Sequence, residues 1–525
     1  MDTCQSTTGA DADMPKDRVA IVGAGVAGLV AAFALAARGL DVTVLERGAS
    51  AGGKMRQIAI GASHIDSGPT VFTMRWVFEE LFAAAGRNFA DHVRLRPLEV
   101  LAKHAWDESA RLDLFADQAR TTDAIGDFAG ATEADGYRAF CRDTKRIYDI
   151  LEKPFLRASQ PSIGGLIGAD GFRGLMRLPQ IKPFSSMWSA LGRYFADPRL
   201  RQLFGRYATY CGSSPYLAPA TLMLVAHVER EGVWSIDGGM SALANALAEG
   251  ARSFGATIRF GQEASEILVS GGRASGVRLA SGERLAADAV IVNADAGAVA
   301  NGLFGTPARR AAAAIPPRAR SLSAMTWSAV AKCEGFPLRR HNVFFSGDYA
   351  AEFDDIFARD RLPGHPTVYV CAQDRDDSEA IATGPERLLI LVNAPANGDR
   401  HTYDAAEVEQ CAQRTFGVLE RMGLQIQRQT DAIRVTTPAD FNRMFPATGG
   451  ALYGRSSHGW TASFQRPGAR TRIPGLYLAG GSTHPGPGVP MAALAGRSAV
   501  ASLLADLTSP QSFRQTVMRG GMSMR

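Results

Sequence analysis

Three glycines near the N-terminus, Gly23, Gly25 and Gly28, have the spacing of a loop that holds a dinucleotide. In such a loop the first glycine makes a tight turn, the second lets the backbone approach a pyrophosphate, and the third lets a helix pack on a strand. The helix start offers unpaired N–H groups and a positive dipole end to the phosphates. Glu46 follows at the distance at which an acid accepts hydrogen bonds from ribose hydroxyls. These residues predict a binding site for an adenosine diphosphate group, and the acid argues against a 2′-phosphate.

The elements that must position this loop lie in the same segment. Residues 18–22 are apolar and rich in β-branched side chains, which predicts a strand buried on both faces. Residues 29–38 repeat apolar side chains compatibly with a helix, and residues 41–45 predict a second strand. The uncharged stretch 19–37 is also long enough for a transmembrane helix. The glycine pattern inside it favours the strand, turn and helix.

A second glycine motif, Gly52-Gly53-Lys54, follows Glu46, and Asp66 to Thr70 comes next. Here the sequence resembles the flavin-containing amine oxidase and phytoene desaturase superfamily. In that superfamily a Gly-Gly-Arg/Lys turn runs under the flavin end of FAD. Lys54 stands where many members have arginine, so a point charge replaces a bidentate contact. The alternative is a simple surface turn.

Near the C-terminus, residues 473–481 predict another buried strand that ends in a glycine turn, and an Ala-rich helix starts after Pro490. This segment resembles the last FAD-binding element of the same superfamily, which meets the ribityl-pyrophosphate and the isoalloxazine. Two such motifs at opposite ends of the chain imply that the cofactor domain is discontinuous. No second Gly-x-Gly-x-x-Gly follows a strand, so a separate NAD(P)H site is not expected.

The resemblance implies an α/β fold with a Rossmann-like FAD-binding domain and a second, α+β substrate domain. The expected division is a disordered lead-in (1–17), the FAD-binding domain (18–71, 226–296 and 436–508), the substrate and membrane-facing domain (72–225 and 297–435), and a tail (509–525). Between the motifs, short strands separated by Gly/Ser turns are predicted at 257–260, 264–269, 276–279 and 289–293.

The residues expected to bind FAD belong to these motifs and their immediate neighbours, apart from Ala264 at the start of a predicted strand. They are Gly23, Ala24, Gly25, Ala27, Gly28, Glu46, Arg47, Gly52, Gly53, Lys54, Gly68, Pro69, Thr70, Ala264, Gly480, Gly481, Pro490 and Met491.

Two further motifs, residues 66–73 and 484–490, favour the carotenoid branch of the superfamily. Within it, residues 445–454 and 457–460 are similar to the hydroxycarotenoid 3,4-desaturases of purple photosynthetic bacteria. That family inserts a C3–C4 double bond beside the tertiary hydroxyl or methoxy end of an acyclic carotenoid such as hydroxyneurosporene. Phytoene desaturase and carotenoid isomerase are the nearer alternatives. A non-catalytic escort protein on the same fold is the remote one.

Desaturation removes a hydride and a proton, and the flavin is the expected hydride acceptor. The proton could pass to a side chain or to water, so a base is not obligatory. His458 is the candidate catalytic residue, with a hydrogen-bonded loop histidine as the alternative. His484 is expected to be structural or close to the cofactor. The sequence contains neither a His-x-His pair nor a His-Glu-x-x-His motif, which disfavours metal chemistry.

Composition places the chain among ordinary globular proteins of more than one domain. Its net charge of +5 is too small and dispersed to indicate nucleic acid binding. Six scattered cysteines without a Cys-x-x-Cys pair favour a reducing compartment. The expected location is the cytoplasm, with peripheral attachment to the inner or intracytoplasmic membrane. The electron acceptor is left open among oxygen, a quinone and other carriers.

Attachment to a membrane is expected because the substrate class is lipophilic. The predicted docking segment is 163–195, in which Met187, Trp188, Leu191, Tyr194 and Phe195 share one helical face. Basic residues lie nearby at Arg173, Arg177, Lys182 and Arg193. Such a pattern is typical of an interfacial amphipathic helix. It is equally typical of a helix that packs on a core.

Overall fold

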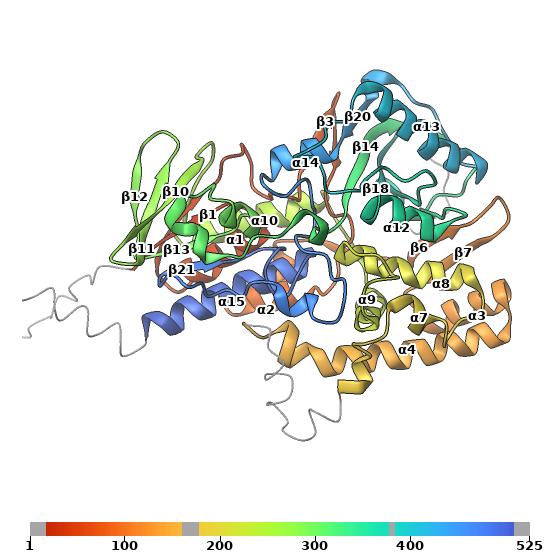
Figure 1. Cartoon of the computed structure of the whole chain (residues 1–525), viewed down its shortest axis with the longest axis horizontal. Helices are drawn as coiled ribbons and strands as arrows, with labels where there is room; N and C mark the ends of the chain where they lie inside the picture. Colours follow the sequence, from red (N-terminus) through yellow and green to blue (C-terminus); the bar gives the residue numbers. More distant parts are fainter. Residues whose placement is uncertain (1–16, 160–177, 377–383, 509–525) are drawn as a thin grey trace, which may run out of the picture.

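The computed structural model describes residues 17–159, 178–376 and 384–508 (Figure 1). The expected lead-in, apart from Asp17, and the expected tail therefore lie outside the described residues. A five-stranded sheet, a seven-stranded sheet and a group of helices form most of the described chain, with smaller sheets beside them, and the seven-stranded sheet lies at the upper right of Figure 1.

The first sheet is parallel and collects its strands from three distant segments. Its order is β21 (Leu476–Leu478), β13 (Ala289–Val292), β1 (Arg18–Val22), β2 (Asp41–Leu45) and β9 (Thr257–Arg259). Because all five strands run in one direction, the loops that follow them gather at one edge. The glycine loop after β1 and the glycine turn after β21 therefore meet at that edge.

Both faces of this sheet are covered. Val19 and Ile21 of β1 face a core shared with the helices, whereas Ala20 and Val22 face a second core. On the helical side, α10 (Met240–Ser253) and α15 (Val489–Leu507) pack on α1 (Val26–Ala36). The other face is covered by an antiparallel sheet of β10 (Ala264–Ser270), β11 (Arg273–Leu279) and β12 (Arg284–Ala286).

Every residue of α1 is buried, which explains why the segment around it carries no charge. The prediction of strand, turn and helix is confirmed, and the helix starts at Val26, three residues before the predicted start at Leu29. Within the described residues, no helix combines the length and the apolar character needed to cross a membrane.

The second sheet is mixed and has seven strands. Its order is β20 (Ile433–Thr436), β14 (Ser323–Ala331), β18 (Glu386–Ala394), β17 (Val368–Ala372), β16 (His341–Phe344), β6 (Val100–Ala105) and β7 (Arg111–Phe115). Helix α13 (Ala405–Arg421) packs on one face, where Phe416 contacts Trp327. The predicted α/β fold class is confirmed by these elements and by the family described below. The domain boundaries stay a prediction.

Helices form a third group, at the lower right of Figure 1. They are α3 (Gln118–Ala129), α4 (Ala131–Leu151), α7 (Met187–Leu191), α8 (Pro198–Gly205) and α9 (Leu224–Arg230). The remaining shorter elements are α2 (Trp76–Ala83), α11 (Ala296–Ala300), α12 (Tyr349–Phe357), α14 (Pro438–Met444), β3 (Gln57–Ile60), β4 (Ser63–Asp66), β5 (Leu95–Pro97), β8 (Trp234–Ile236), β15 (Cys333–Glu334) and β19 (Gln425–Ile426).

The predicted membrane-docking face at 187–195 is wrong. Met187, Leu191 and Phe195 are each 0% exposed, and Phe195 stacks on Phe204 with ring centroids 4.8 Å apart. The apolar spacing of this segment is used to pack inside the helical group. Periodicity alone does not distinguish a core from a bilayer, because both accept the same apolar face. The earlier part of the predicted segment, 163–177, lies outside the described residues.

The close approach of α15 to α1 depends on Gly496. A Cβ at this position would lie 2.4 Å from the carbonyl oxygen of Ala27, which is backbone and cannot move aside. We predict that Gly496→Ala lowers the free energy of unfolding by about 1–3 kcal/mol, because overpacking forces the helices apart. Chemical denaturation of the purified protein measures the change.

Gly417→Ala in α13 is the matched control. There a Cβ would meet only the end of the Arg421 side chain, at 3.5 Å. This variant should keep its stability or gain up to about 1 kcal/mol from helix propensity. Equal stability losses in the two variants would contradict the packing explanation for Gly496.

Candidate cofactor and substrate site

The glycine loop after β1 packs so closely against neighbouring atoms that side chains would not fit at its glycine positions. A Cβ at Gly28 would lie 2.1 Å from the carbonyl oxygen of Gly23. A Cβ at Gly25 would lie 2.8 Å from the side-chain oxygen of Asn293. The N–H groups of Val26 and Ala27 stand at the start of α1, where a helix has no intrahelical acceptors. This arrangement fits a pyrophosphate, which needs close backbone and free N–H donors.

Glu46 directly follows β2 and lies beside this loop. Its carboxylate accepts hydrogen bonds from the backbone N–H groups of Ala24 and Gly48, both at 2.7 Å. The backbone of Gln262 also donates to the carbonyl oxygen of Glu46 at 2.8 Å, which brings the start of β10, including Ala264, to the same edge. The expected ribose end of the site is thus assembled from three segments.

The second glycine motif lies directly on the first. The N–H of Gly52 donates to the carbonyl oxygen of Ala24 at 2.9 Å, and a Cβ at Gly53 would lie 3.1 Å from the Cα of Gly25. A Cβ at Gly68 would lie 1.9 Å from the carbonyl oxygen of Lys54. The glycines of all three N-terminal motifs therefore let one layer of backbone pack on the next.

Two predicted cofactor residues have protein partners instead. The Lys54 ammonium donates to the carbonyl oxygen of Leu452 at 2.6 Å and lies 5.2 Å from the Phe445 ring centroid. The Arg47 guanidinium is bonded to the Met444 carbonyl oxygen. Both cations hold the segment around 444–452 against the glycine motifs. Their direct contact with FAD stays a prediction.

Asn293, at the end of β13, joins the first and last motifs. Its side-chain oxygen accepts from the N–H of Gly28 at 2.9 Å, and its side-chain nitrogen donates to the carbonyl oxygen of Ala479 at 3.1 Å. A Cβ at Gly480 would lie 2.9 Å from that nitrogen. The sequence gives a signal for this role, because Asn293 is a polar residue at the carboxyl end of a buried strand. Sequence reasoning placed the turn and missed the residue.

Arg466 is a second functional residue that sequence reasoning missed. Only 4% of it is exposed, and its guanidinium donates to the carbonyl oxygens of Tyr453 at 2.9 Å and Gly481 at 3.2 Å. The arginine thereby holds the glycine turn after β21 in place. Its removal would leave buried carbonyl groups without donors. An isolated arginine between two motifs carries no recognisable signal in the sequence.

A large cavity opens next to these motifs. It contains about 2130 Å³ of space including its open part, and Gly68, Pro69, Thr70, Pro490 and Met491 line one side. Its other walls are mostly apolar, including Leu151, Leu156, Leu222, Leu224, Val225, Val228 and Leu391. A few polar groups interrupt them, among them Arg206, Tyr210, Glu229, Tyr349 and Tyr369. Such a cleft suits a long apolar ligand with few polar groups.

The candidate catalytic residue, His458, does not line this cavity. Its Nε2 accepts a hydrogen bond from the backbone N–H of Ser214 at 3.0 Å, and its ring packs edge-on against Phe357. Burial lowers the pKa of His458 to about 4, so the ring is neutral at pH 7. The acceptor that a base would use is thus already engaged. A catalytic role for His458 stays a prediction.

His484 is similarly engaged. Its Nε2 donates to the carbonyl oxygen of Phe155 at 2.7 Å, and burial lowers its pKa to about 4.

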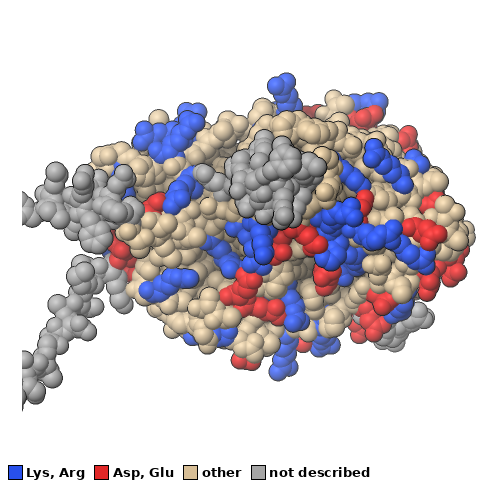
Figure 2. Space-filling view, turned by 90° about the horizontal axis from the view of Figure 1, so that it is seen from below, with Lys and Arg blue, Asp and Glu red and all other residues tan. Residues whose placement is uncertain are grey.

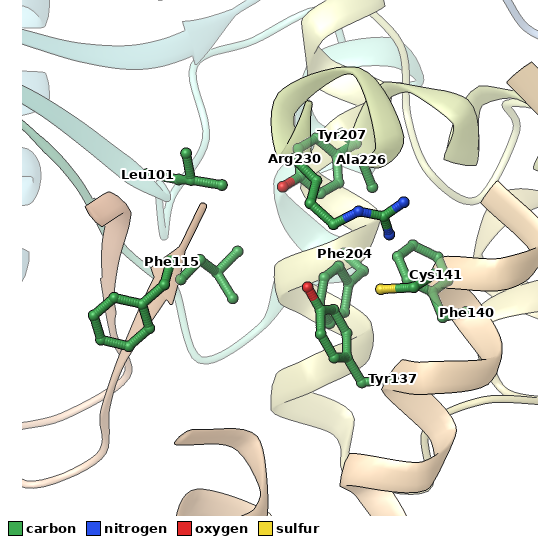
Figure 3. A pocket seen from close by; sticks show the side chains of 10 residues that line it. Leu101, Phe115, Tyr137, Phe140, Cys141, Phe204, Tyr207, Ala226 and Arg230 are labelled. Carbon is green, nitrogen blue, oxygen red and sulfur yellow. The ribbon is translucent and has the colours of Figure 1, made fainter. Parts of the chain in front are cut away.

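A second, small cavity lies away from the motifs, between β6–β7 and the helices α4, α8 and α9 (Figure 3). In Figure 3 the Arg230 guanidinium lies close to Cys141, among aromatic side chains. None of the predicted site residues lines this cavity.

The role of Asn293 is testable by an isosteric change. Asn293→Asp keeps an acceptor for Gly28, but it loses the bond to Ala479 and adds a negative charge next to the expected pyrophosphate. We predict that the Kd for FAD rises about tenfold or more. Titration of apoprotein with FAD measures the affinity, and flavin absorbance per protein reports retention.

Asn301→Asp is the control, because Asn301 undergoes the same change at an exposed position at the end of α11. Its affinity for FAD should equal that of the wild type. Equal FAD affinity in the Asn293 and Asn301 variants would exclude Asn293 as the connection between the motifs.

Comparison with known proteins identifies the family. A model described as flavin containing amine oxidoreductase matches residues 26–504. The chain is 55% identical over 509 residues to hydroxyneurosporene desaturase of Rubrivivax gelatinosus, with 97% of each chain covered. It is 42% identical to the protein of the same name from Rhodobacter capsulatus, covering 94% of this chain and 98% of that one. An oxidoreductase structure from Methanosarcina mazei has a TM-score of 0.60 at 17% identity, covering 93% of this chain and 100% of that one, which shows the fold alone. The resemblance inferred from the motifs is confirmed: the chain belongs to the flavin-containing amine oxidoreductase family and is an FAD-dependent oxidoreductase.

Proposed function

We propose that this enzyme inserts a C3–C4 double bond into an acyclic carotenoid that carries a hydroxyl or methoxy group at C1, such as hydroxyneurosporene. The observation that carries the proposal is the large apolar cavity, which has Gly68, Thr70, Pro490 and Met491 of the expected flavin motifs in its wall. Similarity to hydroxyneurosporene desaturases over nearly the whole chain supports the same substrate class.

The protein's part in the reaction is to bind and orient a polyene and to keep water away from it. FAD, when bound, accepts the hydride that leaves the carbon chain. The glycine motifs, Glu46 and the start of α15 would hold that cofactor. Leu222, Val225 and Leu391 offer apolar walls against which a polyene can lie. Among the described residues that line the cavity none is a histidine, so the proposal assigns no imidazole base.

The test is to give the purified, flavin-loaded enzyme hydroxyneurosporene and phytoene side by side. Absorbance and mass of the products should show loss of two hydrogens and a lengthened chromophore for hydroxyneurosporene, with phytoene unchanged. Conversion of phytoene alone would favour the phytoene desaturase alternative. A product of unchanged mass would favour an isomerase. A protein that stays colourless after FAD is supplied would favour the escort alternative.

Substrate of this class must come from a bilayer. A carotenoid of about forty carbons, at ~0.8 kcal/mol for each, would cost on the order of 30 kcal/mol to pass through water. We therefore propose peripheral attachment to the inner or intracytoplasmic membrane through three exposed apolar residues, Phe184 (79% exposed), Leu217 (51%) and Trp460 (43%). We call these residues the cavity-mouth patch, because Trp460 also lines the cavity.

Contacts among these residues support one continuous patch. The rings of Phe184 and Trp460 meet edge-on with centroids 5.4 Å apart. The N–H of Gly459, next to Trp460, donates to the carbonyl oxygen of Leu217 at 3.0 Å. On the face drawn in Figure 2, Lys and Arg side chains are interspersed with Asp and Glu. The proposal therefore rests on apolar insertion rather than on attraction of a single-sign surface to anionic lipid.

Liposome flotation tests the attachment. The double variant Phe184→Glu, Trp460→Glu should float several-fold less than the wild type, because charges replace the inserting rings. The control is Leu303→Glu, Val435→Glu, which changes two other exposed apolar residues, 40% and 39% exposed, that do not line the cavity. This control should float like the wild type. Equal flotation of the two double variants would rule out the cavity-mouth patch.

A further inference from the structure

An ionised group lies in the wall of the otherwise apolar cavity. Arg206 is 8% exposed and Glu229 is 3% exposed, and both line the cavity. The Arg206 guanidinium donates to the Tyr210 hydroxyl at 3.2 Å, and that hydroxyl donates to the Glu229 carboxylate at 2.8 Å. The Tyr207 hydroxyl donates to the other oxygen of the same carboxylate. We group Tyr349 with these residues as the polar cluster, because it lines the same cavity and the charge of Arg206 acts to lower the pKa of its phenol.

The cluster keeps its donors protonated at neutral pH. Burial acts to lower the pKa of Arg206, but the neighbouring Tyr210 and Glu229 outweigh it and raise that pKa above its usual value. Burial also raises the pKa of the Tyr349 phenol. Arg206 is therefore a cation and Tyr349 a hydroxyl donor. Burying such groups costs free energy, and a purely apolar ligand makes no hydrogen bonds to them that would offset this cost.

Two donors of the cluster have no acceptor among the described residues. They are the Nε of Arg206 and the hydroxyl of Tyr349, and both atoms are buried. Arg206 and Tyr349 both belong to the wall of the cavity. A buried donor without a partner is costly, whereas a ligand oxygen that accepts from it recovers that cost. An oxygen on the ligand would supply the missing acceptor once these side chains turn toward the cavity.

Other polar groups of the cavity wall reach an expected flavin motif through Thr70. The Thr70 hydroxyl lies 2.7 Å from the Tyr369 hydroxyl, which lies 2.7 Å from Nδ1 of His341. Burial, with the nearby charges of Arg340 and Arg206, lowers the pKa of His341 to about 3. The charge of Arg206 therefore acts on His341, whose partner Tyr369 contacts Thr70.

We infer that Arg206 and Tyr349 form a subsite that donates hydrogen bonds to the oxygen at C1 of the carotenoid and selects the oxygenated end of the substrate. This inference rests on the proposed function. Both groups act as donors, and an arginine has no acceptor to offer. A hydroxyl and a methyl ether are both acceptors, so the subsite accepts either. A hydrocarbon end would leave the donors unpaired.

Tyr349→Phe is the sharpest test, because the hydroxyl it removes has no partner among the described residues. We compare Kd values for hydroxyneurosporene, for its methyl ether and for the same polyene without oxygen, using quenching of protein fluorescence by each carotenoid in detergent micelles. The wild type should bind both oxygenated ligands more tightly. Tyr349→Phe should reduce that preference about fivefold, and Arg206→Met about tenfold or more.

Tyr216→Phe is the matched control. Tyr216 packs near Tyr349, with ring centroids 6.4 Å apart, but does not line the cavity. Its preference for oxygenated ligands should equal that of the wild type. Flavin absorbance and the midpoint of thermal unfolding check that each variant is folded, and kcat/KM for the three ligands should follow the Kd values.

The possible outcomes separate the two proposals. A preference that falls in Tyr349→Phe and Arg206→Met but not in Tyr216→Phe supports the subsite. A wild-type preference that both variants retain overturns the subsite and leaves the proposed function intact. A wild type that binds all three ligands equally overturns the subsite and also counts against an oxygenated substrate.

Discussion

The side chain of Asn293 makes two hydrogen bonds, one to the N–H of Gly28 and one to the carbonyl oxygen of Ala479. These bonds tie the glycine loop near the N-terminus to the glycine turn near the C-terminus, with β13 between the two strands that carry them. The amide offers an acceptor and a donor together, whereas a carboxylate offers acceptors alone. The cofactor site, the position of α15 and one wall of the cavity all depend on this connection.

Close backbone packing is the second constraint. The glycines at positions 28, 53, 68 and 496 stand where a Cβ would come within about 3 Å of another backbone atom. Because these positions have no side chain, the backbone segments on either side lie in direct contact. The three motifs can therefore pack on one another, and the two helices can approach closely. No side chain of these glycines covers the N–H groups at the start of α1, so an anion can reach them.

The cavity combines two opposite requirements. In the proposed function a polyene lies against apolar walls such as Val225 and Leu391, whereas Arg206 and Glu229 lose hydration in the same space. A buried ion group of this kind gives directionality, since an apolar tube alone cannot tell one end of a symmetric chain from the other. The partly exposed Trp460 lines this cavity and Phe184 contacts it, so the proposed entry and the proposed selection use different residues of one site.

Much of the fold was predictable because its signals are local. The run of strand, glycine loop, helix and second strand follows from neighbouring residues, and β1, α1 and β2 are found there. The docking face at 187–195 was predicted wrongly because Met187 and Leu191 have a helical spacing that serves a core as well as a bilayer. His458 is the candidate catalytic residue because it lies near the flavin motifs in sequence. Its partner in the structure is the backbone N–H of Ser214, a contact that the side-chain types in the sequence do not predict.

The sequence by itself determined the family and the cofactor, because the glycine and acid spacings are short-range patterns that the backbone geometry demands. Only the tertiary structure decided which distant residues complete the site. Asn293, Arg466, Arg206 and Tyr349 are unremarkable in the linear chain, and they acquire roles when β13 lies between the two motif-bearing strands and the helices close over the seven-stranded sheet. Hydrogen bonds and burial depend on positions in space. Residues that are hundreds of positions apart in the sequence come close together only when the chain folds.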